Sequence, residues 1–230
     1  MKLEHLAILN EERAARRAVV LVTDLETGAQ RVVREAQADS DPAAELIEAR
    51  LRSGKSGPAE IEGRAHFLTV QTPPVKIVVV GAVHISQAFA PMAKLAGFDC
   101  VIVDPRTAFA SPERFPGVPV FAEWPDEALP RIGLDGYTAF VALTHDPKID
   151  DPALDAALRA GCFYIGALGS KKTHARRVER LTDAGFTEAD IARIHAPVGL
   201  DIGAVSPAEI GVAILAEIIG VLRRERRRRA

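Results

Sequence analysis

From residue 75 onward, short apolar runs alternate with longer stretches in which apolar and polar positions repeat at helical spacing. The apolar runs cover 75–80, 99–103, 138–143 and 162–166, with a shorter one at 118–121. A strand that is apolar on consecutive residues is buried on both faces, as in a parallel sheet covered by helices on both sides. Because parallel crossovers are right-handed, the pattern predicts an α/β fold, a Rossmann-like doubly wound parallel sheet.

The stretches between and after these strands predict helices. They cover about 84–96, 124–131, 151–160, 170–184, 187–194 and 206–224. The segment from Ile210 to Leu222 is apolar almost all round. A helix of that kind leaves a large apolar patch if one side faces water. We therefore expect burial on more than one side, within the domain or at a homodimer seam.

Residues 1–72 show a mixed pattern. Helical spacing over 1–17 is followed by strands at 18–23 and 30–34 around a turn at Gly28, a helix from Pro42 to Gly54, and a strand at 65–70. The dipeptide Pro73-Pro74 can continue neither a helix nor a central strand, so it marks a boundary. We predict a small α+β N-terminal module over 1–72 and a Rossmann-like domain over 75–230.

Composition and charge narrow the class of protein. The chain is 48% hydrophobic and 26% charged, which is ordinary for a globular protein. A net charge of −2 gives no general attraction to nucleic acid or anionic lipid, and we interpret the basic tail from Arg223 to Arg229 as a solvated helix end. Two cysteines, Cys100 and Cys162, indicate a reducing compartment. Without a signal-peptide pattern or an apolar run of ~18 residues, we expect a cytoplasmic protein with no membrane span.

The turn after the first parallel strand stands where dinucleotide-binding folds carry G-x-G-x-x-G. Gly81 is present, but Val83 and Ser86 replace the second and third glycines. Val83 adds bulk where a pyrophosphate would approach the backbone, so a standard NAD(P) site is disfavoured. A tight turn that binds no ligand remains an alternative.

Two further strand ends carry polar groups at the carboxyl edge of the sheet, where ligands of open α/β folds bind. Asp104 follows the second strand and forms an Asp-Pro-Arg corner with Arg106. Thr144, His145 and Asp146 follow the strand at 138–143. A histidine beside a carboxylate can be a base, a metal ligand or a helix cap, and without a third partner we favour binding or capping over catalysis.

The segment 164–177 reads as a strand, a glycine turn and a helix. Gly166 and Gly169 let the backbone bend, and Ser170 is a natural N-cap. Lys171, His174 and Arg177 follow at a helical spacing of three, so they can share one face and reinforce an anion held at the helix N-terminus. A structural turn followed by a solvated basic helix face is the alternative.

The segment 195–210 combines a flexible loop with a helix start. Ser206, Pro207 and Glu209 fit an N-cap, N1 and N3 capping box, which is a structural role. Gly199 and Asp201 belong to the preceding loop, whose permissive backbone could lie close against a ligand.

These stretches, in this order, resemble the XdhC/CoxI family of accessory proteins for molybdenum hydroxylases such as xanthine and carbon monoxide dehydrogenases. The resemblance rests on GAVHIS at 81–86, VIVDPR at 101–106, LTHDPKIDDPAL at 143–154, YIGALGSKKTHARR at 164–177 and HAPVGLDIGAVSPAEI at 195–210. It implies a Rossmann-type domain that binds molybdenum cofactor, protects it during sulfuration and delivers it to the apo-hydroxylase, without turnover of its own.

The resemblance also implies a cofactor-binding set and partners. The set comprises Gly81, His84, Asp104, Arg106, Thr144, His145, Asp146, Gly166, Gly169, Ser170, Lys171, Arg177, Gly199 and Asp201, with no catalytic residue and no metal ligand. Residues 1–72 look like a shortened, cysteine-free version of the amino-terminal domain of the family, so a separately encoded partner could supply thiols. The alternatives are an NAD(P)-dependent oxidoreductase and the structural half of a split accessory complex.

Overall fold

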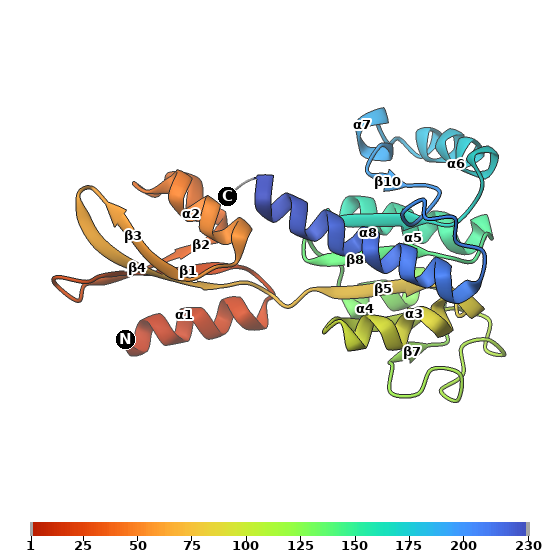
Figure 1. The fold of residues 1–230 in the computed structure, drawn as a ribbon, viewed down its shortest axis with the longest axis horizontal. Coiled ribbons are helices and arrows are strands. Elements are labelled where there is room, and N and C mark those ends of the chain that lie inside the picture. Colours follow the sequence, from red (N-terminus) through yellow and green to blue (C-terminus); the bar gives the residue numbers. More distant parts are fainter. Residues whose placement is uncertain (1, 229–230) are drawn as a thin grey trace. The chain divides into compact units, whose positions relative to one another are not determined.

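The computed structural model describes residues 2–228, with side chains for residues 2–224. The chain divides into two units, one of residues 74–222 and one of residues 1–73 with the residues from Arg223 onward. The larger unit contains a six-stranded sheet in the order β10-β9-β8-β5-β6-β7, and all of its strand pairs are parallel (Figure 1). The predicted Rossmann-like parallel sheet is therefore confirmed.

The strands of this sheet follow the apolar runs of the sequence. They are β5 (Lys76–Val80), β6 (Asp99–Val103), β7 (Val120–Phe121), β8 (Thr138–Ala142), β9 (Tyr164–Ala167) and β10 (Ile194–His195). The chain leaves β5 toward one edge of the sheet and returns to the other side of β5 at β8, which is the strand order of dinucleotide-binding folds. The carboxyl ends of β5 and β8 thus form the topological switch point where ligands of such folds bind.

Helices cover both faces of the parallel sheet. Alternate residues of its strands therefore pack into two separate hydrophobic cores. Val78 and Val80 pack with one set of helices, whereas Ile77 and Val79 pack with the other. The first set is α4 (Pro125–Ile132), α5 (Pro147–Arg159), α6 (Lys171–Asp183) and α7 (Glu188–Ile191), and the second is α3 (His84–Leu95) and α8 (Pro207–Arg228). This burial on both faces explains why the strands are apolar at nearly every position.

The smaller unit is an antiparallel sheet in the order β2-β1-β4-β3. Its elements are α1 (Leu3–Ala14), β1 (Val19–Asp24), β2 (Gln30–Arg34), a 3₁₀ helix (Glu35–Ser40), α2 (Ala44–Ser53), β3 (Gly57–Ile61) and β4 (Arg64–Gln71). Figure 1 shows α1 and α2 on opposite faces of this sheet, which explains why the central strand β1 is buried from Val19 to Val22. The predicted α+β module and its β1–β2 hairpin are confirmed.

Several predicted boundaries are wrong. The helix expected over 187–194 ends at Ile191, because Ile194 and His195 pair with β9 as a short parallel strand. The helix expected from residue 151 begins at Pro147, since the Asp146 side chain accepts a hydrogen bond from the Lys148 amide and caps the helix. The strand β3 was not predicted; it contains Pro58 and lies at the edge of its sheet, where proline is tolerated.

The apolar segment Ile210–Leu222 is buried mainly within the chain. Ile214 and Ile218 are fully buried against the second core, whereas Val212 is 47% exposed. Burial against the sheet therefore accounts for most of this segment without a homodimer seam. Within residues 2–228, no helix combines the length and the apolar character needed to span a bilayer. The side chains of the basic tail beyond Arg224 lie outside the described residues.

Candidate functional site

The switch point brings the turn after β5 against the loop after β8. Gly81 has φ +120°, and a Cβ there would lie 3.0 Å from the Thr144 methyl carbon and 3.2 Å from the Thr144 amide nitrogen. Glycine is thus required both by the backbone conformation and by the close approach of the neighbouring chain. Two of the predicted site segments, 81–86 and 143–148, are therefore direct neighbours.

Asp104 holds the turn after β5 through a hydrogen bond from the Ala82 amide. Its fully buried carboxylate accepts hydrogen bonds from the amides of Ala82 (2.7 Å) and Arg106 (2.9 Å). It also accepts two from the Arg106 guanidinium, at 2.9 Å and 2.7 Å. Burial alone would raise the pKa of Asp104, but the Arg106 hydrogen bonds outweigh it, so the pKa is lowered. With every bond directed to protein donors, this carboxylate is not presented to a ribose hydroxyl in the manner of a dinucleotide site.

Arg106 is held in this corner by Asp104 and by an aromatic ring. Its pKa is raised by its hydrogen bonds to Asp104 first, and further by the charges of Asp146 and Asp150. The guanidinium also lies 4.7 Å from the centre of the Phe109 ring, a cation–π contact. Asp104 and Phe109 thus fix the position of the Arg106 guanidinium.

The loop after β8 is organised by Asp150. This buried carboxylate accepts hydrogen bonds from the Thr144 hydroxyl (2.6 Å) and from the His145 amide (3.0 Å). Burial raises its pKa, although the Thr144 hydrogen bonds and the charge of Arg177 oppose that rise. The exposed His145 is held at φ +64°, a left-handed conformation that few non-glycine residues adopt. Asp146 serves as the cap of α5.

A pocket between α5 and α6, which we name the α5–α6 pocket, opens beside His145. Its volume is about 370 Å³. The lining includes His145, Asp150, Lys172, Thr173, Arg176 and Arg177. Arg177 is 2% exposed, and its Nη2 donates to the Leu168 carbonyl at 2.9 Å. The sequence segments 143–148 and 164–177 therefore meet at this pocket.

The glycine turn before α6 is built as expected, but its basic residues diverge. Gly169 has φ +138°, and a Cβ there would lie 3.0 Å from the Thr173 methyl carbon. The Ser170 hydroxyl caps α6 by accepting from the Thr173 amide at 3.2 Å. Lys171 is exposed and lies outside the lining of the α5–α6 pocket, whereas Arg177 is buried in that lining. The two side chains do not share one exposed helix face.

Gly166 and Gly199 lie beside a second polar cluster, which is centred on Glu217. Glu217, in the middle of α8, accepts from the Tyr164 hydroxyl (2.6 Å) and the Gly199 amide (2.9 Å), and its other oxygen lies 3.1 Å from His195 Nδ1. A Cβ on Gly166 would lie 2.5 Å from a Val198 methyl carbon, so close packing requires this glycine. Gly199 belongs to the same cluster.

Two predicted residues stay apart from these clusters. His84 begins α3 and Asp201 lies in the loop before α8, and both are exposed. In the described part of the chain, no hydrogen bond or ion pair joins either side chain to another predicted site residue. Both remain candidates only through the family resemblance.

Sequence reasoning missed several polar residues. Asp150 and Glu217 organise two loops, and Lys172 and Arg176 line the pocket instead of Lys171. Glu217 had a signal: it is the lone charged residue within the apolar segment Ile210–Leu222. A carboxylate in such a segment is costly unless it is hydrogen-bonded, so it marks a buried polar contact.

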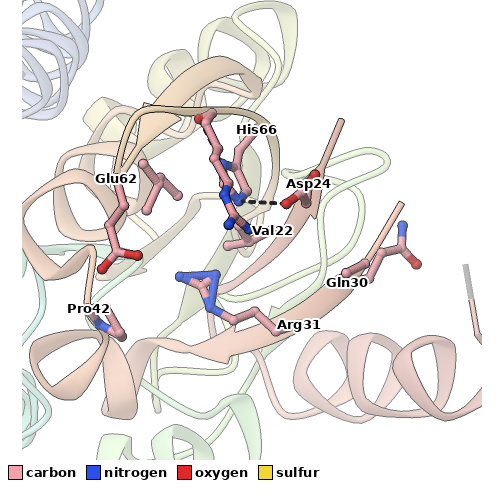
Figure 2. A pocket seen from close by; sticks show the side chains of 10 residues that line it. Val22, Asp24, Gln30, Arg31, Pro42, Glu62 and His66 are labelled. Carbon is pink, nitrogen blue, oxygen red and sulfur yellow. Dashed lines mark hydrogen bonds and ion pairs between the residues drawn. The ribbon is translucent and has the colours of Figure 1, made fainter. Parts of the chain in front are cut away.

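Another pocket, of about 300 Å³, lies in the smaller unit. Figure 2 shows His66 facing Asp24, with His66 Nε2 lying 3.9 Å from Asp24 Oδ2. The Asp24 carboxylate also accepts from the amides of Glu26 and Thr27, and Arg31 pairs with Asp41 outside the pocket lining. Asp24 is therefore engaged in holding the β1–β2 turn, and Arg31 is engaged with the segment before α2.

Both thiols are unreactive by burial. Cys100 and Cys162 are buried, and burial raises the pKa of each to about 12. Because the thiolate is the reactive form, we expect iodoacetamide at pH 8 to label neither cysteine in the folded protein and both in denaturant, as read by mass spectrometry. Labelling of either thiol within minutes under native conditions would contradict this prediction.

Comparisons with known proteins identify several relatives of this chain. Curated relatives include the uncharacterized protein YqeB (32% identical over 155 residues) and the molybdenum cofactor insertion chaperone PaoD (32% over 149 residues), both of Escherichia coli K12. A third, from Bacillus subtilis 168, is described as a probable xanthine dehydrogenase subunit and is 29% identical over 159 residues. These matches cover 67%, 65% and 69% of this chain but 29%, 41% and 46% of the relatives, so the chain spans less than half their length.

The fold and the family are shown by two further matches. A crystal structure of a xanthine dehydrogenase from Bacillus halodurans at 2.80 Å resolution superposes with a TM-score of 0.69 at 22% identity, covering 97% of this chain and 68% of that one. This likeness supports the fold. Residues 77–218, more than half of the chain, match the XdhC Rossmann domain. The chain therefore belongs to the XdhC family.

Proposed function

We propose that this chain binds molybdenum cofactor and delivers it to a molybdenum hydroxylase of the xanthine dehydrogenase or carbon monoxide dehydrogenase type, in the cytoplasm. The observation that carries the proposal is the similarity to PaoD, a molybdenum cofactor insertion chaperone, over 65% of this chain. The region that matches the family contains the switch point and the α5–α6 pocket. A cofactor that ends in a phosphate or a nucleotide diphosphate suits basic groups at a sheet edge.

Under this proposal the site residues fall into four groups. Thr144, His145, Asp146, Gly169 and Arg177 surround the pocket and turn on one side of the switch point. Gly81, Asp104 and Arg106 shape the other side, while Gly166 and Gly199 set the backbone around Glu217. His84, Ser170, Lys171 and Asp201 complete the set at exposed positions.

The experiment is a transfer assay. The purified chain is loaded in cells that make molybdenum cofactor and analysed for molybdenum and pterin. It is then mixed with an apo-hydroxylase, and we expect enzyme activity to appear faster than with the same amount of free cofactor. A chain that carries neither molybdenum nor pterin and does not accelerate activation would refute the proposal.

An NAD(P)-dependent oxidoreductase is the enzyme alternative, and Asp104 argues against it. The carboxylate that would bind a ribose is saturated by Ala82 and Arg106. We therefore expect titration with NADH or NADPH to leave the intrinsic fluorescence of Trp124 and the melting temperature unchanged. Saturable binding of either nucleotide at micromolar concentration would favour the alternative.

A further inference from the structure

We propose that the α5–α6 pocket binds the phosphate groups of a diphosphate-bearing ligand, with Arg177 as the central contact. The identity of the natural ligand rests on the proposed function. The new element is the location of the phosphate contacts, which we place in this pocket and not at the exposed Lys171. The pocket lies within the larger unit, and its walls come from α5, α6 and the loop after β8.

Arg177 is the strongest observation. It is 2% exposed, and its Nη2 donates to the Leu168 carbonyl at 2.9 Å. Its Nε and Nη1 are buried and have no hydrogen-bond partner among the residues that the structure describes. Buried N–H groups of a cation are costly to leave unpaired. A phosphate oxygen pair matches the fork of a guanidinium and would satisfy both nitrogens.

The charges around Arg177 favour an anion. Lys172 and Arg176 are exposed neighbours at a spacing of four on α6, so they lie on one face of the helix. Arg180 also lines the pocket but is engaged in an ion pair with Asp151. Both oxygens of Asp150 accept hydrogen bonds from the loop after β8. Two cations besides Arg177 are thus available to a ligand.

The wall opposite α6 is fixed in an uncommon conformation. His145 lines the pocket at φ +64°, and Asp150 holds that conformation by accepting its amide hydrogen bond at 3.0 Å. Strained backbone of this kind persists where the surrounding structure over-determines it, and it gathers at ligand sites. Thr173, whose hydroxyl is hydrogen-bonded to that of Ser170 at 3.0 Å, lines the pocket from the first turn of α6, and the dipole at the N-terminus of this helix also favours an anion.

The size of the pocket points to more than a single phosphate. A volume of about 370 Å³ is in the range of small-molecule sites, and an isolated phosphate would fill only a small part of it. A diphosphate could engage Arg177 with one phosphate and Lys172 or Arg176 with the other. The ligand class is therefore a diphosphate ester, which includes the nucleotide form of a pterin cofactor.

Binding of inorganic pyrophosphate to the full chain tests the pocket without any cofactor. Isothermal titration at low ionic strength would compare the wild type with the Lys172→Ala/Arg176→Ala double variant and with Arg177→Gln. Arg131→Ala is the matched control, because it removes an exposed cation from α4, away from the pocket. Circular dichroism of each variant verifies the fold. Since Arg177 is buried and its variant could misfold, the double variant of exposed residues is decisive.

We expect pyrophosphate to bind the wild type and Arg131→Ala alike, and the double variant at least about tenfold more weakly, which is the scale of losing one or two charge-assisted contacts. Affinity should also fall as salt is added, because the contacts are ionic. No binding by the wild type, or equal binding by the folded double variant, would overturn the proposal.

The two experiments also distinguish failure of the proposed phosphate site from failure of the proposed function. A chain that binds pyrophosphate through Lys172 and Arg176 but never loads molybdenum cofactor would refute the proposed function and leave the pocket standing. A chain that loads and transfers cofactor equally well with the double substitution would refute the pocket alone.

Discussion

Replacing Asp104 with asparagine is expected to lower the free energy of unfolding of the larger unit by about 1–3 kcal/mol, the scale of leaving buried hydrogen-bonding groups without a partner. The carboxylate is fully buried and accepts from the Ala82 amide and three donors of Arg106. An asparagine amide nitrogen can only donate, so it would face donors that have no other partner. Urea unfolding followed by circular dichroism would give the change in midpoint and slope.

Asp155→Asn provides the matched control. Its carboxylate pairs with Arg159 at the surface of α5, and surface pairs contribute about 0–1 kcal/mol. We expect its unfolding midpoint to stay close to that of the wild type. If Asp104→Asn were equally mild, the corner between Gly81 and Arg106 would not depend on the Asp104 carboxylate.

The Asp104 effect should also depend on pH in a defined direction. Although burial alone would raise it, the pKa of Asp104 is lowered in the folded protein, mainly by Arg106. A lowered folded pKa means that the stabilisation is complete above the unfolded value of about 3.9 and is lost as the pH falls through the folded value. The gap between wild type and Asp104→Asn should therefore be largest near pH 7 and narrow below pH 4. An unchanged gap at pH 3 would contradict this account.

Most of the fold could be predicted from hydrophobic periodicity. The runs 75–80, 99–103 and 138–143 became β5, β6 and β8 with boundaries shifted by at most one residue. Their signal is strong because residues on both faces of these strands enter a core, so the apolar pattern is continuous. The Pro73-Pro74 dipeptide coincides with the point where the two units divide.

Short elements could not be predicted, because distant pairing forms them. The strand Ile194–His195 exists through its register with Ile165 and Gly166, about thirty residues earlier in the chain. The strand that contains Pro58 is held by its pairing with β4, and proline argues against a strand in any local reading.

The candidate site shows the same limit at the level of side chains. The sequence identified Lys171 and Arg177 in one basic segment but could not tell which neighbours line a pocket. A helix rotates by about 100° per residue, so Lys172 and Lys171 face different surroundings, and tertiary packing decides which one meets α5. The partners of Glu217 lie 53, 22 and 18 residues away in sequence, which no local motif specifies.

Glu217→Leu should also lower the free energy of unfolding of the larger unit strongly, by about 3 kcal/mol. The substitution leaves hydrogen-bond donors without their acceptor, and each buried donor costs about 1–3 kcal/mol when unpaired. The Tyr164 hydroxyl donates to this carboxylate at 2.6 Å, and the Gly199 amide donates at 2.9 Å. His195 stacks on Tyr164, with ring centroids 4.7 Å apart, and contacts the same carboxylate. One side chain of α8 thus holds β9, β10 and the following loop.

Combining Glu217→Leu with Tyr164→Phe in one chain tests whether the two side chains act through their shared hydrogen bond. In the wild-type background, Tyr164→Phe removes one hydrogen bond to Glu217 and should cost about 1 kcal/mol. In the Glu217→Leu background the hydroxyl of the buried Tyr164 is already unpaired, so removing it should be neutral or stabilising. Hydrogen exchange at the Gly199 amide should accelerate in both Glu217 variants but not in Tyr164→Phe alone. Additive costs in the double variant would mean that Tyr164 and Glu217 stabilise the unit independently, and that the loop at Gly199 is held by packing alone.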